Sequence, residues 1–349
     1  MKTIIRKVDR GQIDKAVMAE AGEILIRGGL VAFPTETVYG LGANALDEEA
    51  AKKTYAAKGR PSDNPLIVHI AGISYLKAIA KEIPEAALKL AEKFWPGPLT
   101  MIFDKSEIVP YGTTGGLDTV AVRMPDDEIA RELILAGGGY ISAPSANTSG
   151  RPSTTTAQHV EEDLSGKIEM IVDGGPVEIG VESTIVDMTV VPPMILRPGA
   201  ITKEMLEEEI GEVTVDKAII TPDSNIAPKA PGMKYRHYAP KADLTVVEGD
   251  VNDVIAYIND KIKEAAQKEL KCGVIATKET EDRYRDADVK CAGTREDEMT
   301  IAAGLYRILR EFDDDSVDVI YSEAFYSDGI GSAVMNRLLK AAGHHIVNV

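Results

Sequence analysis

Two strand-like runs lie close together in LTMIFDKSEIVPYGTTGGLDTVAVRM, residues 99–124. The runs LTMIF and TVAVRM are apolar or β-branched, and the segment between them has glycines and a proline but no helical period. Further strand-like runs follow at YISAP, IEMIVD and STIVDM, with helical patterns near residues 126–136 and 156–163. So many strands with few crossover helices predict a large, twisted mixed sheet rather than a regular doubly wound one.

The chain before this stretch alternates helix and strand signals. Apolar residues at helical spacing predict a helix over residues 11–27 that Gly28-Gly29 ends. LVAFPT and PLIVHI read as strands, and DEEAAKKTYAAK reads as a helix behind Asp47. In IPEAALKLAEKFW, Pro84 is expected at the first helical position.

A different pattern begins after residue 213. Residues 213–243 are rich in proline and lack a sustained period. Apolar and aromatic side chains there, such as Met233 and Tyr238, favour an ordered linker over the alternative of a disordered tether. The strands DLTVVEG, CGVIAT, VDVIYSE and HHIVNV then alternate with helices near 251–269, 297–312 and 331–342. This repetition predicts a small parallel sheet with helices on both faces. The expected domains are therefore 1–212, the linker 213–243, and 244–349.

Composition limits the class of protein. The 349 residues are 44% hydrophobic and 27% charged, which is typical of a globular chain. The net charge is −17, and no basic run offers a nucleic-acid face, so strong autonomous nucleic-acid binding is not expected. No apolar run approaches the roughly 20 residues of a membrane span, and no signal peptide is evident. Two isolated cysteines, Cys272 and Cys291, predict a reduced, cytoplasmic protein without structural zinc.

Short polar stretches at strand ends are the candidates for chemistry. They are FPTETVYGLGAN, KGRPSDN, TVAVRMP, SAPSANTSGRPS, VESTIVD and LRPG. Each has a plain structural explanation by itself, and His69 in an apolar strand also fits a core histidine. Together, hydroxyls, amides and arginines at the strand ends of one sheet predict a polar groove. The chain has no Walker A motif, so phosphates would need another loop, and GIGSAVMNRLLKAAG is better explained by turn and cap glycines than by a phosphate site.

The loop KGRPSDN supplies the cations of this set. It places Lys58 and Arg60 two residues apart, and Pro61 and Pro65 stiffen the backbone around them. A stiff loop with two cations predicts an anionic ligand held in place.

The ordered set of FPTETVYGLGAN, KGRPSDNPL, SAPSAN, VESTIVD, LRPG and PGMKYRHYAPK resembles threonylcarbamoyl-AMP synthase. The resemblance is to the long form, a YrdC-like domain joined to a smaller C-terminal domain. It implies an α/β protein with a large twisted mixed sheet and helices, followed by a smaller parallel-sheet, Rossmann-like α/β domain. The aromatic and cationic residues and the three prolines of residues 228–241 predict that this part of the linker forms a lid over the nucleotide, with a plain connector as the alternative.

The resemblance implies a nucleotidyltransferase reaction in tRNA processing. L-Threonine, bicarbonate and ATP give threonylcarbamoyl-AMP and pyrophosphate, and a separate transferase completes threonylcarbamoyladenosine on tRNA. Magnesium is expected to bind through the phosphates, with no protein metal ligands. Residues implied to surround threonine are Thr37, His69, Arg123, Ala143 and Ser183. Residues implied to bind ATP are Arg60, Asn64, Thr119, Ser145, Asn147, Ser153, Arg197 and Tyr235, with Lys58 and Arg60 as the catalytic cations.

Two other functions remain open from the sequence. One is a carbamoyl-adenylate-forming enzyme like the YrdC-like part of hydrogenase-maturation carbamoyltransferases, which also carry cysteine-rich zinc motifs. The other is an RNA-binding module that uses a concave surface, which the −17 charge disfavours.

Overall fold

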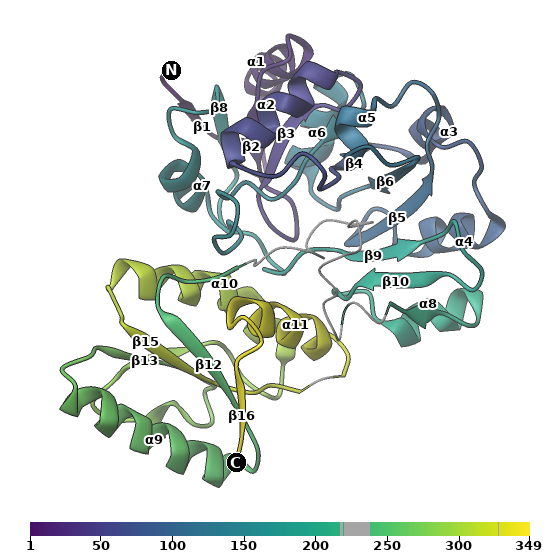
Figure 1. Cartoon of the computed structure of the whole chain (residues 1–349). Helices are drawn as coiled ribbons and strands as arrows, with labels where there is room; N and C mark the ends of the chain where they lie inside the picture. The colour runs from purple at the N-terminus through teal and green to yellow at the C-terminus, as the bar shows by residue number, and fades with distance from the viewer. Residues whose placement is uncertain (217–218, 220–237, 327) are drawn as a thin grey trace. The chain divides into compact units, whose positions relative to one another are not determined.

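The computed structural model describes residues 1–216, 219, 238–326 and 328–349, which form two compact units (Figure 1). The second unit contains the described chain from residue 238 onward and two short segments from earlier in the sequence, Gly150–Pro152 and Ile179–Val181. The first unit contains the rest. The domain boundaries at 212 and 243 stay predictions, and most of the expected linker and lid lies outside the described residues.

The first unit follows the alternation expected from the sequence. Its strands are β1 (Ile4–Lys7), β2 (Val31–Phe33), β3 (Gly40–Asn44), β4 (Ile67–His69), β5 (Leu99–Asp104), β6 (Thr119–Arg123), β7 (Ile141–Ser142), β8 (Met170–Asp173), β9 (Thr184–Asp187), β10 (Met194–Arg197) and β11 (Thr214–Val215). Its α-helices are α1 (Lys15–Ile26), α2 (Glu48–Lys58), α3 (Leu76–Ile79), α4 (Glu85–Phe94), α5 (Tyr111–Thr114), α6 (Glu128–Ala136), α7 (Ala157–Leu164) and α8 (Lys203–Ile210).

These strands form one mixed sheet. Within the described residues its order is β1-β8-β2-β3-β7-β4-β6-β5-β9-β10-β11. The two strand-like runs of residues 99–124 form β5 and β6, which pair antiparallel. β4 runs parallel to β6 and antiparallel to β7. The expectation of a large mixed sheet is confirmed.

Local sequence signals set several helix ends. The Asp14 carboxylate accepts hydrogen bonds from Ala16 and Val17 at the start of α1, and α1 stops before Gly28, whose φ is +75°. The Asp47 side chain caps α2 in the same way. The expectation for Pro84 is off by one position: Pro84 is the N-cap, and α4 begins at Glu85. Proline suits either place because the first turn has no partner for its missing N–H.

Apolar packing covers both faces of the sheet. Met18 and Leu25 of α1 join Leu133 of α6 in one core, and Val160 of α7 packs with Leu41 of β3 in another. A third core packs α4 against the β5–β9–β10 part of the sheet. The loops at the strand ends are thereby held on a rigid frame.

The second unit is a parallel α/β fold. Its elements are β12 (Asp243–Glu248), α9 (Val251–Gln267), β13 (Cys272–Ala276), β14 (Asp288–Cys291), α10 (Glu298–Asp314), β15 (Val319–Glu323), α11 (Gly331–Ala341) and β16 (Ile346–Asn348). The strand order is β14-β13-β15-β12-β16, and every pair is parallel. Figure 1 shows α9 on one face and α10 and α11 on the other, as expected. The sequence analysis missed β14, whose residues are only half-buried and carry a weak apolar signal.

The glycines at the start of α11 act as turn and cap residues, the interpretation that the sequence favoured over a phosphate site. The Gly331 N–H donates to the Glu298 carboxylate at 3.0 Å, so an internal carboxylate already meets the first N–H of this helix. Gly329 adopts a φ of +53°, which a turn requires. Among the described residues, no helix is both long enough and apolar enough to span a bilayer.

Candidate active site

Neighbouring strand ends bring His69 and Arg123 together. His69 ends β4 and Arg123 ends β6, and the two residues are paired in the parallel register of these strands. On its other side Arg123 is paired with Thr100 of β5. The sheet therefore places three polar residues side by side at one level, where loops from several strands converge.

Arg123 forms a buried ion pair with Glu36. Its Nη2 lies 2.7 Å from the Glu36 Oε2, and both side chains are at most 7% exposed. The contact lacks hydrogen-bond geometry, and both Glu36 oxygens and the Arg123 Nε and Nη2 have no hydrogen-bond partner among the described residues. Buried charged groups normally have their hydrogen-bonding capacity filled, so this pair has capacity for a ligand that carries both charges.

His69 is buried beside this pair. Burial, and next the positive charge of Arg123, lower the pKa of His69 to about 3. Its Nδ1 lies 3.2 Å from the Ile67 carbonyl, and its ring meets the edge of Phe33. His69 is thus a neutral hydrogen-bonding group at neutral pH.

The lowered pKa of His69 predicts a pH-dependent stability. The unfolded chain binds a proton near pH 6.5 and the folded chain does not, so the stabilisation is complete above about pH 6.5 and declines as the pH falls towards about 3. His69→Gln is expected to flatten the decline in unfolding free energy between about pH 7 and pH 5. The fluorescence of the single tryptophan, Trp95, during urea unfolding reports on the first unit.

His345→Gln, in the second unit, serves as the control for this experiment. It should leave the pH dependence of the Trp95 transition unchanged. An equal decline for the wild type and His69→Gln would contradict a neutral buried histidine.

Ser183, directly before β9, contacts the strands on both sides of β9. Its hydroxyl lies 2.8 Å from the Thr100 hydroxyl and accepts a hydrogen bond from Arg197 Nη2 at 3.1 Å. Arg197 Nε also donates to the Ser183 carbonyl at 3.0 Å. Because Arg197 occupies an acceptor position of the Ser183 hydroxyl, the serine proton is directed to Thr100 or to a ligand.

Lys58 ties α2 to the loop that follows β7. It is 1% exposed, and its Nζ donates to the carbonyls of Ser145 and Asn147. The Ser145 hydroxyl in turn donates to the Asn147 Oδ1 at 2.5 Å. The ammonium, the hydroxyl and the amide expected at the ATP site therefore form one connected group.

Arg60 and Asn64 lie on the turn that follows α2. Gly59 ends the helix at a φ of 62°, and Arg60 then donates from Nε to the Asn64 carbonyl and from Nη2 to the Pro65 carbonyl. These bonds hold the loop around the guanidinium, as its proline content predicts. The Asn64 side chain is buried, and its Oδ1 has no hydrogen-bond partner among the described residues.

The remaining expected site residues are more dispersed. Ser153 donates to Glu182 Oε1 at 2.5 Å. The hydroxyl oxygens of Thr37 and Thr35 are 2.9 Å apart. Ala143 follows β7 and donates its N–H to Ile67. Thr119 begins β6, four residues before Arg123, which places it about 13 Å away along an extended strand. Tyr235 lies outside the described residues.

Sequence reasoning gave no role to three residues that the structure brings into this site. Glu36 pairs with Arg123, Thr100 with Ser183, and Glu182 with Ser153. Glu36 and Glu182 each lie in a polar stretch that was already singled out, so their signal was present. Thr100 lies in an apolar strand and gave none.

Comparisons with known proteins cover almost the whole chain. Residues 23–199 match the Sua5/YciO/YrdC family model, described as Telomere recombination, and residues 201–343 match the model described as Threonylcarbamoyl-AMP synthase, C-terminal domain. The threonylcarbamoyl-AMP synthase of Pyrococcus abyssi is 51% identical over 99% of this chain and 100% of its own length. The corresponding protein of Bacillus subtilis is 50% identical over 95% of this chain and 94% of its own length.

A solved structure shares the fold of the whole chain. The crystal structure of P. abyssi Sua5 complexed with L-threonine superimposes with a TM-score of 0.94, at 51% identity, over 99% of this chain and 100% of that one.

Proposed function

The chain belongs to the threonylcarbamoyl-AMP synthase family, and on that premise we propose how its first unit divides its site between threonine and ATP. The protein forms threonylcarbamoyl-AMP and pyrophosphate from L-threonine, bicarbonate and ATP. The product serves the synthesis of threonylcarbamoyladenosine in tRNA. The two other functions left open by the sequence are set aside, because relatives about 50% identical over nearly their full length are named as this synthase. The assignment of separate threonine and ATP positions rests on the buried Arg123–Glu36 pair, whose hydrogen-bonding capacity is not filled by the described residues.

Threonine binds at this pair. Arg123 donates from Nε and Nη2 to the substrate carboxylate, and Glu36 accepts from the ammonium group, so one amino acid supplies what both side chains lack. His69, Thr37 and Ser183 offer hydrogen bonds for the threonine hydroxyl, and a site built to bond a hydroxyl rejects apolar isosteres. Ala143 leaves room for the side chain.

ATP binds along the loops that follow α2 and β7. Lys58 and Arg60 face the phosphates as a point charge and a planar donor. The Asn64 Oδ1, which has no hydrogen-bond partner among the described residues, can accept from a hydroxyl or amino group of the nucleotide. The other residues proposed to hold the nucleotide are Thr119, Ser145, Asn147, Ser153, Arg197 and Tyr235.

The chemistry needs alignment more than a nucleophilic side chain. The threonine ammonium group first loses a proton to solvent. The resulting amine attacks the bicarbonate carbon and water leaves, which gives a carbamate. A carbamate oxygen then attacks the α-phosphorus, and the bond to pyrophosphate breaks. The enzyme contributes position and positive charge over the phosphates.

Magnesium enters with ATP in this proposal. The donors of Lys58 and Arg60 fit phosphate oxygens rather than a cation, so the metal would be held mainly by the phosphates, where it neutralises their charge. A separate transferase receives the product and modifies tRNA. Two free thiols, Cys272 and Cys291, support a reducing cytoplasmic setting.

The function is tested by the substrate requirement for pyrophosphate release. Purified protein with ATP and magnesium is expected to release pyrophosphate only when both threonine and bicarbonate are present, because the carbamate must form before the α-phosphorus is attacked. Label from bicarbonate should appear in an adenylate. Equal release without threonine would contradict the reaction.

Valine, which has the size of threonine but no hydroxyl, is the matched substrate control for that assay. It should support turnover at least about tenfold less well, because the buried hydroxyl partners are left without a bond.

A further inference from the structure

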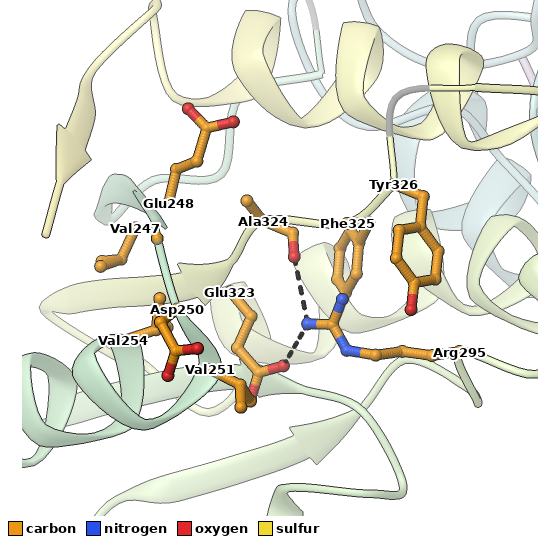
Figure 2. Close-up of a pocket in the computed structure, with 11 residues that line it drawn as sticks. Val247, Glu248, Asp250, Val251, Val254, Arg295, Glu323, Ala324, Phe325 and Tyr326 are labelled. Carbon is orange, nitrogen blue, oxygen red and sulfur yellow. Dashed lines mark hydrogen bonds and ion pairs between the residues drawn. The ribbon is translucent and has the colours of Figure 1, made fainter.

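A cavity of about 520 Å³ lies in the second unit, and none of its lining residues is one proposed for the synthase reaction. It is formed by the segment that ends β12 and begins α9, by the segment after β15, and by Arg295 (Figure 2). Its volume is in the range of small-molecule sites, roughly 300–1,000 Å³. All of its lining residues are described ones within this unit.

The cavity sits where the strand order reverses. β12 and β15 are parallel neighbours, with Val247 paired with Glu323 near their carboxyl ends. From β12 the chain passes through α9 across β15 to β13, whereas from β15 it passes through α11 across β12 to β16. The two connections leave in opposite directions and cover opposite faces (Figure 1), which opens a crevice between adjacent strand ends. Ligands of open α/β sheets bind at such a point.

One wall of the cavity carries three flat groups. The guanidinium of Arg295 lies 5.8 Å from the ring centres of Phe325 and Tyr326, within cation–π distance. Arg295 Nη2 donates to the Glu323 carboxylate at 2.8 Å and to the Ala324 carbonyl at 3.1 Å. These bonds fix the plane of the guanidinium. A planar heterocycle is the ligand shape that such a wall recognises.

The buried charge of this wall is already balanced internally. The second oxygen of Glu323 accepts a hydrogen bond from the buried Tyr284 hydroxyl at 2.8 Å, and this carboxylate raises the pKa of Tyr284, after burial itself. Arg295 is committed to Glu323, so it is not a free cation for a phosphate. Its Nε is buried and has no hydrogen-bond partner among the described residues.

The opposite rim carries carboxylates. Glu248 is the last residue of β12, Asp250 caps α9, and both are exposed (Figure 2). Carboxylates at a strand end accept hydrogen bonds from sugar hydroxyls in folds of this kind. They repel phosphate, and Val251 and Tyr326 add exposed apolar surface beside them.

We propose that this cavity binds a nucleoside that carries no phosphate. The base lies against Phe325, Tyr326 and the guanidinium of Arg295, and the sugar hydroxyls donate to Glu248 and Asp250. The net acidity of the rim makes affinity fall from adenosine to AMP to ATP, the reverse of a phosphate-binding site. The proposal stands on the second unit alone and does not depend on the function proposed for the first.

Calorimetry on the full-length chain with adenosine tests the proposal. The first unit is saturated beforehand with threonine and a non-hydrolysable ATP analogue, so the remaining heat reports on the second unit. Val251→Trp fills the mouth of the cavity from an exposed position and should weaken adenosine binding by about tenfold or more. Leu270→Trp, at a similarly exposed apolar position outside the cavity, should change adenosine binding less than about twofold.

A second variant keeps the test decisive if Val251→Trp perturbs α9. Tyr326→Ala removes a half-exposed ring and should also weaken adenosine binding by about tenfold or more, because base stacking is lost. Adenosine binding that is absent, that survives both variants, or that is weaker than ATP binding would overturn the proposal. Binding of spermidine without adenosine would replace the nucleoside with a polyamine and overturn it equally. Failure of the synthase assay would leave these outcomes unchanged.

Discussion

Arg123→Ala is expected to destabilise the first unit by about 3–5 kcal/mol, because it leaves the Glu36 carboxylate buried without its ion-pair partner. The same change removes the donor for the substrate carboxylate. Where the variant remains folded, the threonine KM should rise by roughly 10- to 150-fold, which corresponds to a charge-assisted hydrogen bond of about 1.5–3 kcal/mol. Urea unfolding followed by Trp95 fluorescence measures the first effect, and pyrophosphate release against threonine concentration measures the second.

The double variant Arg123→Leu/Glu36→Leu separates stability from binding. Removal of both charges should recover most of the lost unfolding free energy, because apolar replacement of a buried pair is often neutral or better. It should not recover threonine binding. A double variant that restored a normal threonine KM would show that the pair is only structural, and would remove the proposed role of Glu36 toward the ammonium group.

Lys58→Met is expected to lower kcat by about 10²- to 10³-fold, the size of effect seen when one fixed donor to developing charge is removed. The methionine keeps most of the length and the apolar character of the buried stem but cannot donate to the carbonyls of Ser145 and Asn147. The loop after β7 then loses its tie to α2 at the same time as the phosphates lose a cation. Threonine binding, measured by calorimetry without ATP, should change little because the Arg123–Glu36 pair is intact.

Lys52→Met, on the same helix, is the matched control. Lys52 is exposed and paired with Glu49, and such surface pairs contribute little. Its kcat should stay within about twofold of the wild type. If Lys58→Met weakened threonine binding as much as it weakened turnover, Lys58 would act through the shape of the whole site rather than at the phosphates.

Much of the fold was predictable because its signals are local. Caps at Asp14 and Asp47 and the glycine at position 28 set helix ends from a few neighbouring residues. The scarcity of crossover helices between strands indicated a mixed sheet, and the β-α alternation after residue 243 indicated a parallel one. Strand β14 was missed because its half-buried residues lack the continuous apolar run of the other strands.

The sequence predicted which polar stretches form the site, but not which of their side chains pair with one another. The local sequence of residues 58–64 alone indicates an anionic ligand, since it places two cations on a proline-stiffened turn. Nothing near Glu36 in the sequence identifies Arg123 as its partner, and nothing near Thr100 identifies Ser183. The Thr100–Ser183 pair arises because β5 and β9 lie side by side in the sheet, whereas the Arg123–Glu36 pair arises because the loop between β2 and β3 reaches the end of β6.

The sequence by itself therefore determined the family, the element types and the residues available for chemistry, because motifs and periodicities depend on neighbours along the chain. The tertiary structure alone decided which of those residues meet, since strand order is set by the packing of apolar surfaces that are distant in sequence. The cavity between β12 and β15 illustrates this most clearly. Glu248, Arg295 and Phe325 belong to three separate segments, and they line one crevice only because the sheet places the carboxyl ends of those strands together and sends their helices to opposite faces.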